Sequence, residues 1–195
     1  RREREWVSPE RGAWFSLVLR PELSPREASV ITLAASVAVA RALRGIGVDP
    51  EIKWPNDVLI DGRKVCGILV ELQADAEMVD HAVVGIGLNA NSKPDVPDAD
   101  PTSVRQELGD DVDRAELVAD VLTEFEKLYG ADHDEVLEEW NSLSSTLGRE
   151  VRVETTDGTV EGVADRLDTT GALVVSTDDG ERVIAAGDCE HLRGS

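Results

Sequence analysis

The sequence predicts an α/β (α+β) protein in which a mixed β-sheet is flanked by helices and is followed by a small β-barrel. Up to residue 147, apolar β-prone runs alternate with longer stretches whose apolar residues recur at helical spacing. From residue 148 onward, short β-prone runs alternate with glycine-containing turns, a pattern typical of a small barrel. We therefore expect two domains in this chain of 195 residues, residues 1–147 and residues 148–195.

The first strand and the first helix are predicted close to the N-terminus. Residues 14–19 are apolar and β-prone, and Arg20-Pro21 ends them. The run Ser24-Pro25-Arg26-Glu27 is a capping box with proline at the first helical position, so we expect the helix to begin there. Its apolar face continues to about Arg44, and Gly45 and Gly47 end it.

A β-hairpin is predicted in the middle of the chain. Asp61-Gly62 is a tight-turn signal between strands at residues 58–60 and 64–72, and a further strand at residues 51–54 precedes them. Residues 78–88 form another buried strand, and the prolines between residues 89 and 101 predict a loop. Two amphipathic helices are expected at residues 113–129 and 133–147, and barrel strands at residues 151–154, 160–167, 172–176 and 182–184.

The net charge of −20 is unevenly distributed. Residues 1–72 are near neutral, with 11 Lys and Arg against 10 Asp and Glu, whereas residues 75–140 carry 4 against 19. Acidity with few lysines suits a protein kept soluble in concentrated salt, so we expect halophilic adaptation; an acidic protein from ordinary salt is the alternative. Nucleic-acid binding is disfavoured because phosphate contacts need clustered Lys and Arg. The near-neutral segment is where we expect an anionic ligand.

Signals for membranes, export and metal binding are missing from the sequence. No apolar run approaches the roughly 20 residues of a membrane-spanning helix, and no signal-peptide core follows the N-terminus, so a cytoplasmic protein is expected. Cys66 and Cys189 show neither metal-type spacing nor a disulfide framework, and the three histidines share no ligand spacing. We expect no metal held mainly by histidine or cysteine, and we interpret Cys66, inside an apolar strand, as a core residue.

Three stretches carry polar groups that could do chemistry. Gly85-Ile86-Gly87-Leu88-Asn89-Ala90 fits the dinucleotide fingerprint, but prolines rather than a helix follow it, which argues against a dinucleotide site. The arginines among residues 1–11 form either a solvated surface or a phosphate-binding loop. The third stretch is the hairpin.

The hairpin places Lys64 at the start of the most apolar strand of the chain, with Gly67 leaving space beside it. A lysine after a turn is usually an exposed cation, but here it could neutralise a carboxylate or phosphoryl oxygen during a reaction. Asp57, across the hairpin, could serve as a base toward an incoming amine or orient a metal. A purely structural role for Trp54-Pro55-Asn56-Asp57 is the alternative, since proline restricts its neighbours.

These residues together resemble a known family. Lys53-Trp54-Pro55-Asn56-Asp57, then Arg63-Lys64-x-x-Gly67-Ile68-Leu69-Val70-Glu71, then Gly85-Ile86-Gly87-Leu88-Asn89, is similar to the core of a biotin protein ligase. The part from Gly148-Arg149 to Leu192-Arg193 resembles the SH3-like C-terminal domain of that family. The resemblance covers essentially the whole chain. It implies the class II synthetase-like biotin/lipoate ligase fold.

The resemblance also implies an activity. Members of the family activate biotin with Mg²⁺-ATP to biotinyl-5′-adenylate, release pyrophosphate, and transfer biotin to a lysine of a biotin carboxyl carrier protein. Lys64 and Asp57 are the implied catalytic residues. The implied biotin-binding residues are Arg1, Arg2, Lys64, Gly67, Leu69 and Gly85. The implied ATP-binding residues are Arg1, Arg4, Trp6, Asn56, Lys64, Asn89 and Arg193.

Two departures from the family pattern lie at the N-terminus. Arg1 stands where the last arginine of the family's arginine-glycine loop is expected, so we expect the N-terminal part of the ligase to precede this stretch; Glu3 stands where a glycine is usual. A non-catalytic fragment that binds biotin, an adenylate or a carrier domain, and a lipoate ligase-like enzyme, are the alternatives. An exposed sheet edge could also form a homodimer.

Overall fold

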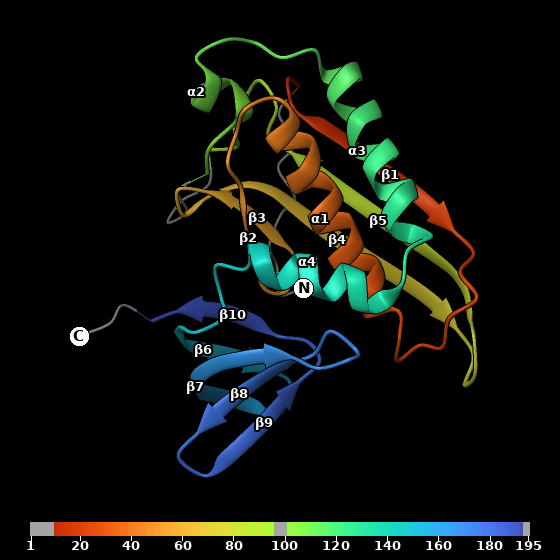
Figure 1. Ribbon diagram of the computed structural model, residues 1–195, viewed down its shortest axis with the longest axis vertical. Helices are drawn as coiled ribbons and strands as arrows, with labels where there is room; N and C mark the ends of the chain where they lie inside the picture. Colours follow the sequence, from red (N-terminus) through yellow and green to blue (C-terminus); the bar gives the residue numbers. More distant parts are fainter. Residues whose placement is uncertain (1–9, 96–100, 193–195) are drawn as a thin grey trace.

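The computed structural model describes residues 10–95 and 101–192, which form two β-sheets and four helices (Figure 1). The elements of the larger part are β1 (Ala13–Leu19), α1 (Ser29–Gly45), β2 (Glu51–Lys53), β3 (Asp57–Ile60), β4 (Arg63–Ala74), β5 (Val79–Leu88), α2 (Val104–Leu108), α3 (Arg114–Tyr129) and α4 (His133–Leu143). The C-terminal part contains β6 (Glu150–Thr155), β7 (Gly158–Leu167), β8 (Leu173–Thr177), β9 (Gly180–Ile184) and β10 (Asp188–His191).

The larger sheet has the strand order β1-β5-β4-β3-β2, and α1, α3 and α4 pack together in front of it in the view of Figure 1. Its neighbouring strands are all antiparallel. Among the described residues, parallel pairing occurs as two isolated bridges, Ile52 with Ser144 and Lys64 with Pro101. The predicted fold class is confirmed, because helices pack against a sheet and a separate small β-sheet follows. The prediction of a mixed sheet is wrong, since each pair of neighbouring strands is antiparallel.

Helix α1 forms the centre of the core because it contacts the sheet as well as α3 and α4. Nearly every residue from Ile31 to Leu43 is buried, which explains why this helix is rich in alanine and valine rather than apolar on one stripe. Its predicted start was too early. The Ser24–Glu27 capping bonds do form, but residues 25–28 are a turn closed by i→i+3 hydrogen bonds, and the helix begins at Ser29.

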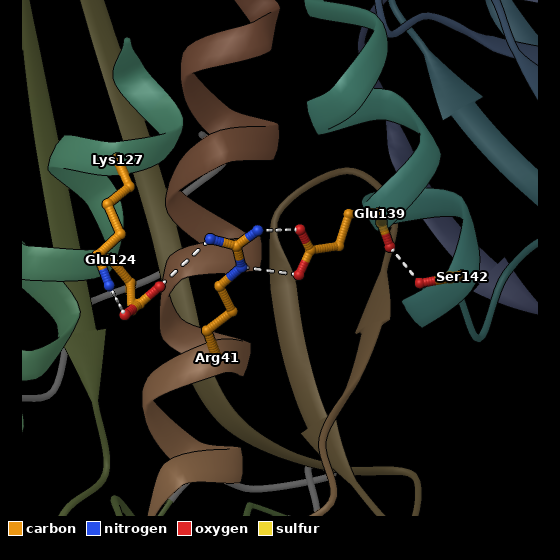
Figure 2. A network of polar contacts seen from close by, with 5 residues as sticks. All are labelled: Arg41, Glu124, Lys127, Glu139 and Ser142. Atoms are coloured by element: carbon orange, nitrogen blue, oxygen red, sulfur yellow. Dashed lines mark hydrogen bonds and ion pairs between the residues drawn. The ribbon is translucent and has the colours of Figure 1, made fainter. Parts of the chain in front are cut away.

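A half-buried arginine joins the three packed helices (Figure 2). The guanidinium of Arg41, on α1, donates from Nε to Glu139 of α4 at 2.8 Å and also donates a second bond from Nη2 to the same carboxylate. Its Nη1 donates to Glu124 of α3 at 3.2 Å, and Glu124 also accepts from Lys127 at 2.6 Å. Two helices that carry much of the acidic excess are thereby tied to the core helix.

Three features differ from the predictions. Helix α4 ends at Leu143 rather than residue 147, because Ser145 leaves the helix to donate its N–H to Ile52 O of β2 at 2.8 Å. The short helix α2 was not predicted, although Ser103 caps its start and Gly109, at φ 81°, ends it. The C-terminal sheet, in the order β10-β6-β7-β8-β9, has one strand more than predicted.

No helix within the described ranges is both long and apolar enough to cross a membrane. The boundary expected between residues 147 and 148 stays a prediction.

Candidate functional site

The β3–β4 hairpin brings Lys64 and Asp57 together. Its turn is the predicted one, with both Asp61 (φ 49°) and Gly62 (φ 74°) in the left-handed region that such a two-residue turn requires. Asp57 pairs with Gly67 across the ladder, and Lys64 Nζ lies 2.5 Å from Asp57 Oδ1. The Lys64 side chain is 49% exposed, so its ammonium remains accessible to a ligand.

Glycines form the floor beside this ion pair. Gly67 pairs with Gly87 of β5, and Leu69 pairs with Gly85, so these positions share the sheet face of Asp57. A methyl group at Gly67 would lie 3.0 Å from Lys64 Cε and Nζ. The Lys64 side chain therefore runs over Gly67, on the face of the sheet that carries Asp57.

A cavity of about 320 Å³ opens on the same face. Its wall comes from β1, β4 and β5, and is made by Trp14, Phe15, Ser16, Leu69, Glu71, Val83, Gly85 and Ile86. A methyl group at Gly85 would meet Leu69 O at 3.6 Å and Ser16 Oγ at 3.8 Å, so glycine keeps this floor low. The cavity size is near the lower end of small-molecule sites.

A smaller cavity of about 100 Å³ lies between the larger sheet, α1 and the C-terminal part. Trp54, Pro55 and Asn56 form one wall, and Gly171, Ala185 and Ala186 contribute from the C-terminal part. Leu69 lines both cavities. Lys64 and Asp57 line neither cavity, but Leu69 shares the sheet face of Gly67, which pairs with Asp57.

The two asparagines singled out in the sequence make main-chain contacts that hold the site. Asn56 O accepts from Ile68 N at 3.0 Å, and Asn56 Nδ2 donates to Ile68 O. Asn89 is 5% exposed, and its Nδ2 donates to Thr102 O at 2.9 Å and to Lys64 O at 3.3 Å. Asn56 lines the smaller cavity, whereas the amide nitrogen of Asn89 is already engaged within the protein.

Trp54 connects the site to the C-terminal part. It is 2% exposed, precedes Pro55 through a cis peptide bond, and donates its indole N–H to Gly171 O at 3.4 Å. Its backbone N–H donates to Thr146 Oγ1 at 3.0 Å, and this hydroxyl also lies 3.0 Å from His191 Nε2. Burial, together with nearby cations, lowers the pKa of His191 to about 4, so this histidine is neutral near pH 7.

The Cys66 thiol is buried in the core. Cys66 is 1% exposed, and burial raises the pKa of its thiol to about 12, which confirms the interpretation as a core residue. In the part of the chain that the structure describes, no group of three or more His, Cys, Asp or Glu side chains could hold a metal ion.

Several expected site residues lie outside the described ranges: Arg1, Arg2, Arg4, Trp6 and Arg193. Among the others, the structure brings Asp57, Lys64, Gly67, Leu69 and Gly85 to one face of the sheet. Sequence reasoning missed Trp14, Ser16 and Glu71 as cavity residues. Every second residue of a strand faces the same side, which could have predicted that Trp14 and Ser16 lie on one face. Placing them in the cavity also requires the strand register, in which Trp14 pairs with Gly87 and Ser16 with Gly85.

Comparisons with known protein families match two separate segments of the chain. Residues 1–89 match the Biotin/lipoate A/B protein ligase family, and residues 146–192 match the Biotin protein ligase C terminal domain. The two segments fall on the larger sheet and on the C-terminal sheet, respectively.

Curated relatives align over nearly the whole chain. The bifunctional ligase/repressor BirA of Bacillus subtilis is 38% identical over 97% of this chain, which spans 62% of that relative's length. The biotin–[acetyl-CoA-carboxylase] ligase of Paracoccus denitrificans is 34% identical over 96% of this chain and 83% of the relative.

Solved structures agree with these relatives. The apo structure of the biotin protein ligase from Aquifex aeolicus superposes with a TM-score of 0.82 at 26% identity, covering 94% of this chain and 84% of that one. Its complex with biotin and ATP superposes with a TM-score of 0.80 at 28% identity, covering 98% and 82%. The hairpin motif, the glycine floor and these matches agree: the chain belongs to the biotin protein ligase family.

Proposed function

We propose that this protein activates biotin with ATP to biotinyl-5′-AMP and transfers biotin to a lysine of a biotin carboxyl carrier protein. The observation that carries the proposal is the Lys64–Asp57 pair beside the Gly67–Gly87 floor, in a chain 28% identical to a ligase solved with biotin and ATP. The relative from Paracoccus denitrificans, named as a biotin–[acetyl-CoA-carboxylase] ligase, supports the same reaction.

In the first step, a carboxylate oxygen of biotin attacks the α-phosphorus of ATP, and the bond to pyrophosphate breaks. Negative charge builds on the phosphoryl oxygens between two anionic reactants. The Lys64 ammonium, which is held at the floor of the site yet accessible, neutralises this charge and the biotin carboxylate. Gly67, Leu69 and Gly85 leave the low apolar surface on which we place biotin, with the 320 Å³ cavity receiving it.

In the second step, the carrier lysine attacks the acyl carbon as a neutral amine. The new amide bond forms, AMP leaves, and the amine must lose a proton. Asp57 is placed to accept this proton, because its contact with Lys64 locates it beside the reacting carboxyl group and its side chain is 24% exposed. We assign Asp57 this role, and we assign Asn56 and Asn89 to the nucleotide side of the site, Asn89 acting by holding the main chain of Lys64.

Magnesium fits this site as a companion of ATP. Mg²⁺ commonly binds through substrate phosphates, waters and one or two carboxylates rather than in an all-protein cage. The described residues provide Asp57 and no larger acidic cluster, which matches that mode. The ion supplies charge neutralisation on the phosphates when it is bound.

Two other activities remain distinguishable from this proposal. A lipoate ligase-like enzyme would share the first family match, but the match of residues 146–192 to a biotin protein ligase C-terminal domain favours biotin. A fragment that binds ligand without turnover would bind biotin but give no pyrophosphate exchange. A homodimer stays a prediction, with β1 as an edge strand of the larger sheet.

The proposal is tested by biotin-dependent ATP–pyrophosphate exchange in the intact protein, with lipoate as the competing acid. We expect exchange with biotin, and a loss of at least 100-fold in Lys64→Ala, which is the scale for removing a group that stabilises transition-state charge. Lys127→Ala, which removes an exposed lysine on α3, is the matched control and should leave the rate unchanged. Exchange with lipoate alone, or a Lys64→Ala rate close to that of the wild type, would contradict the proposal.

A further inference from the structure

The side chain of Lys64 shares a sheet face with Gly67 only because β4 contains an extra residue. Asp57 pairs with Gly67 and Val58 with Cys66, but the next residue, Leu59, pairs with Lys64, so Val65 is skipped. Strand side chains alternate between faces, and without the bulge Lys64 would share a face with Cys66 and Ile68. The turn places Lys64 opposite Leu59 and so on the face of Asp57, and the bulge at Val65 puts Gly67 and Leu69 on that same face.

Two backbone carbonyls at the bulge accept hydrogen bonds from Asn89, which directly follows β5, and from Thr102, which precedes α2. Asn89 N donates to Val65 O at 2.8 Å. Thr102 N donates to Lys64 O at 2.9 Å, and the Asn89 side chain donates to the same oxygen. These bonds hold the main chain on both sides of the Lys64–Val65 peptide.

A buried cluster holds Thr102 in turn. Thr102 is fully buried, and its hydroxyl donates to Glu107 of α2. The Glu107 carboxylate also pairs with Arg63 at 3.0 Å, and its side chain is only 15% exposed. Arg63 directly precedes Lys64, so the cluster joins α2 to the start of β4. Glu107 thus neutralises the charge of Arg63 within the protein, whereas Lys64 faces Asp57 and the ligand side.

We infer that Thr102 and Glu107 are positioning residues for Lys64, acting by holding the Val65 bulge through which its ammonium shares a face with Gly67 and Leu69. The inference rests on the proposed function, because Lys64 is the group through which both residues act. Neither residue touches the reacting atoms in this arrangement. Their removal should weaken the contribution of Lys64 and leave contributions of other groups unchanged.

The test is a double-mutant cycle on biotin-dependent exchange, because residues that act through one group are non-additive with its removal. Thr102→Val removes the hydroxyl at nearly constant volume, and Thr102→Ser keeps it. We expect Thr102→Val to lower the exchange rate about tenfold, within the range seen for residues in one network, and Thr102→Ser to stay within about threefold. In the Lys64→Ala background, Thr102→Val should cause no further loss.

A second variant and a control complete the design. Glu107→Ala should repeat the same pattern, and it serves in place of Thr102→Val where thermal unfolding shows that the valine variant does not fold. Arg105 lies on α2, as Glu107 does, and forms an exposed ion pair with Asp111. Arg105→Gln removes this pair and should leave exchange unchanged.

The two proposals fail in different ways. If the wild-type protein shows no biotin-dependent exchange, the proposed function is wrong and the positioning role is lost with it. If the wild type is active but Thr102→Val and Glu107→Ala lower the rate equally with and without Lys64, only the positioning role is refuted. An unchanged rate in both single variants refutes it as well.

Discussion

Gly67→Ala, at the centre of the site, should lower activity without lowering stability. The added methyl group would lie 3.0 Å from Lys64 Cε and Nζ, which is tighter than the optimal separation of about 3.5–4.0 Å, so the lysine must yield by a few tenths of an ångström. Gly67 does not have a positive φ, so alanine fits its backbone. Alanine in a strand interior should even stabilise by about 0.5–1 kcal/mol relative to glycine.

The functional cost follows from the displaced charge. At an effective dielectric constant of about 20, an ammonium about 4 Å from a carboxylate gains about 4.2 kcal/mol, and at about 4.5 Å about 3.7 kcal/mol. A shift of about 0.5 Å therefore loses roughly 0.5 kcal/mol, or about twofold in binding. The methyl group also occupies part of the expected ligand floor, so we expect a loss of more than about twofold.

The assay measures exchange kcat/KM, the dissociation constant for biotin by titration calorimetry, and Tm on the same samples. We expect weaker biotin binding and slower exchange with an equal or higher Tm. Gly62→Ala is the control with the opposite expectation: φ is 74° and nothing lies within 4 Å of the added group, so it should cost about 1–2 kcal/mol in stability without touching the site. Unchanged kcat/KM in Gly67→Ala would refute the reasoning about Lys64.

Three further predictions concern the rest of the molecule. Arg41→Ala should lower stability by about 2 kcal/mol, or Tm by roughly 4–8 °C, because the half-buried Glu139 loses its cationic partner and Glu124 loses one of two; Lys127→Ala, at an exposed pair, should change stability by at most about 0.5 kcal/mol. The pKa of His191 is lowered to about 4, so the unfolded chain binds a proton between pH 6.5 and 4 that the folded chain does not. Stability should therefore fall as pH drops through that range, and chemical denaturation of His191→Gln should show a smaller loss; equal losses would contradict the assignment. If the acidity is a halophilic adaptation, circular dichroism should show greater thermal stability in molar KCl than at low salt, and equal Tm values would require another cause.

Local chemistry made parts of the fold predictable from sequence. Asp61-Gly62 specifies its turn because both positions adopt positive φ, which few residues tolerate. The Lys64–Asp57 neighbourhood followed from that turn, since a hairpin pairs residues at fixed offsets. The apolar runs of β1, β4 and β5 and of α1 needed only period and length.

Other features depended on partners far away in sequence. The end of α4 depends on Ile52, about 90 residues earlier, because the Ile52 carbonyl accepts hydrogen bonds from the backbone N–H and the hydroxyl of Ser145. The strand β10 forms because β6 offers an open edge to residues 188–191, a short segment with little propensity of its own. The ends of α2 are set by local caps. Its position beside the site depends on the ion pair of Glu107 with Arg63 and on the hydrogen bond from Thr102 N to Lys64 O.

The sequence by itself determined the fold class, the tight turn, the core helix and the residue types that a ligand-activating site needs, because these depend on period, turn chemistry and short offsets. Only the tertiary structure decided that Lys64 shares its sheet face with Gly67 and Leu69. That choice depends on one skipped residue in the β3–β4 register and on backbone hydrogen bonds from Asn89 and Thr102. A one-residue shift reverses the direction of a strand side chain, and hydrogen bonds between distant segments select the register.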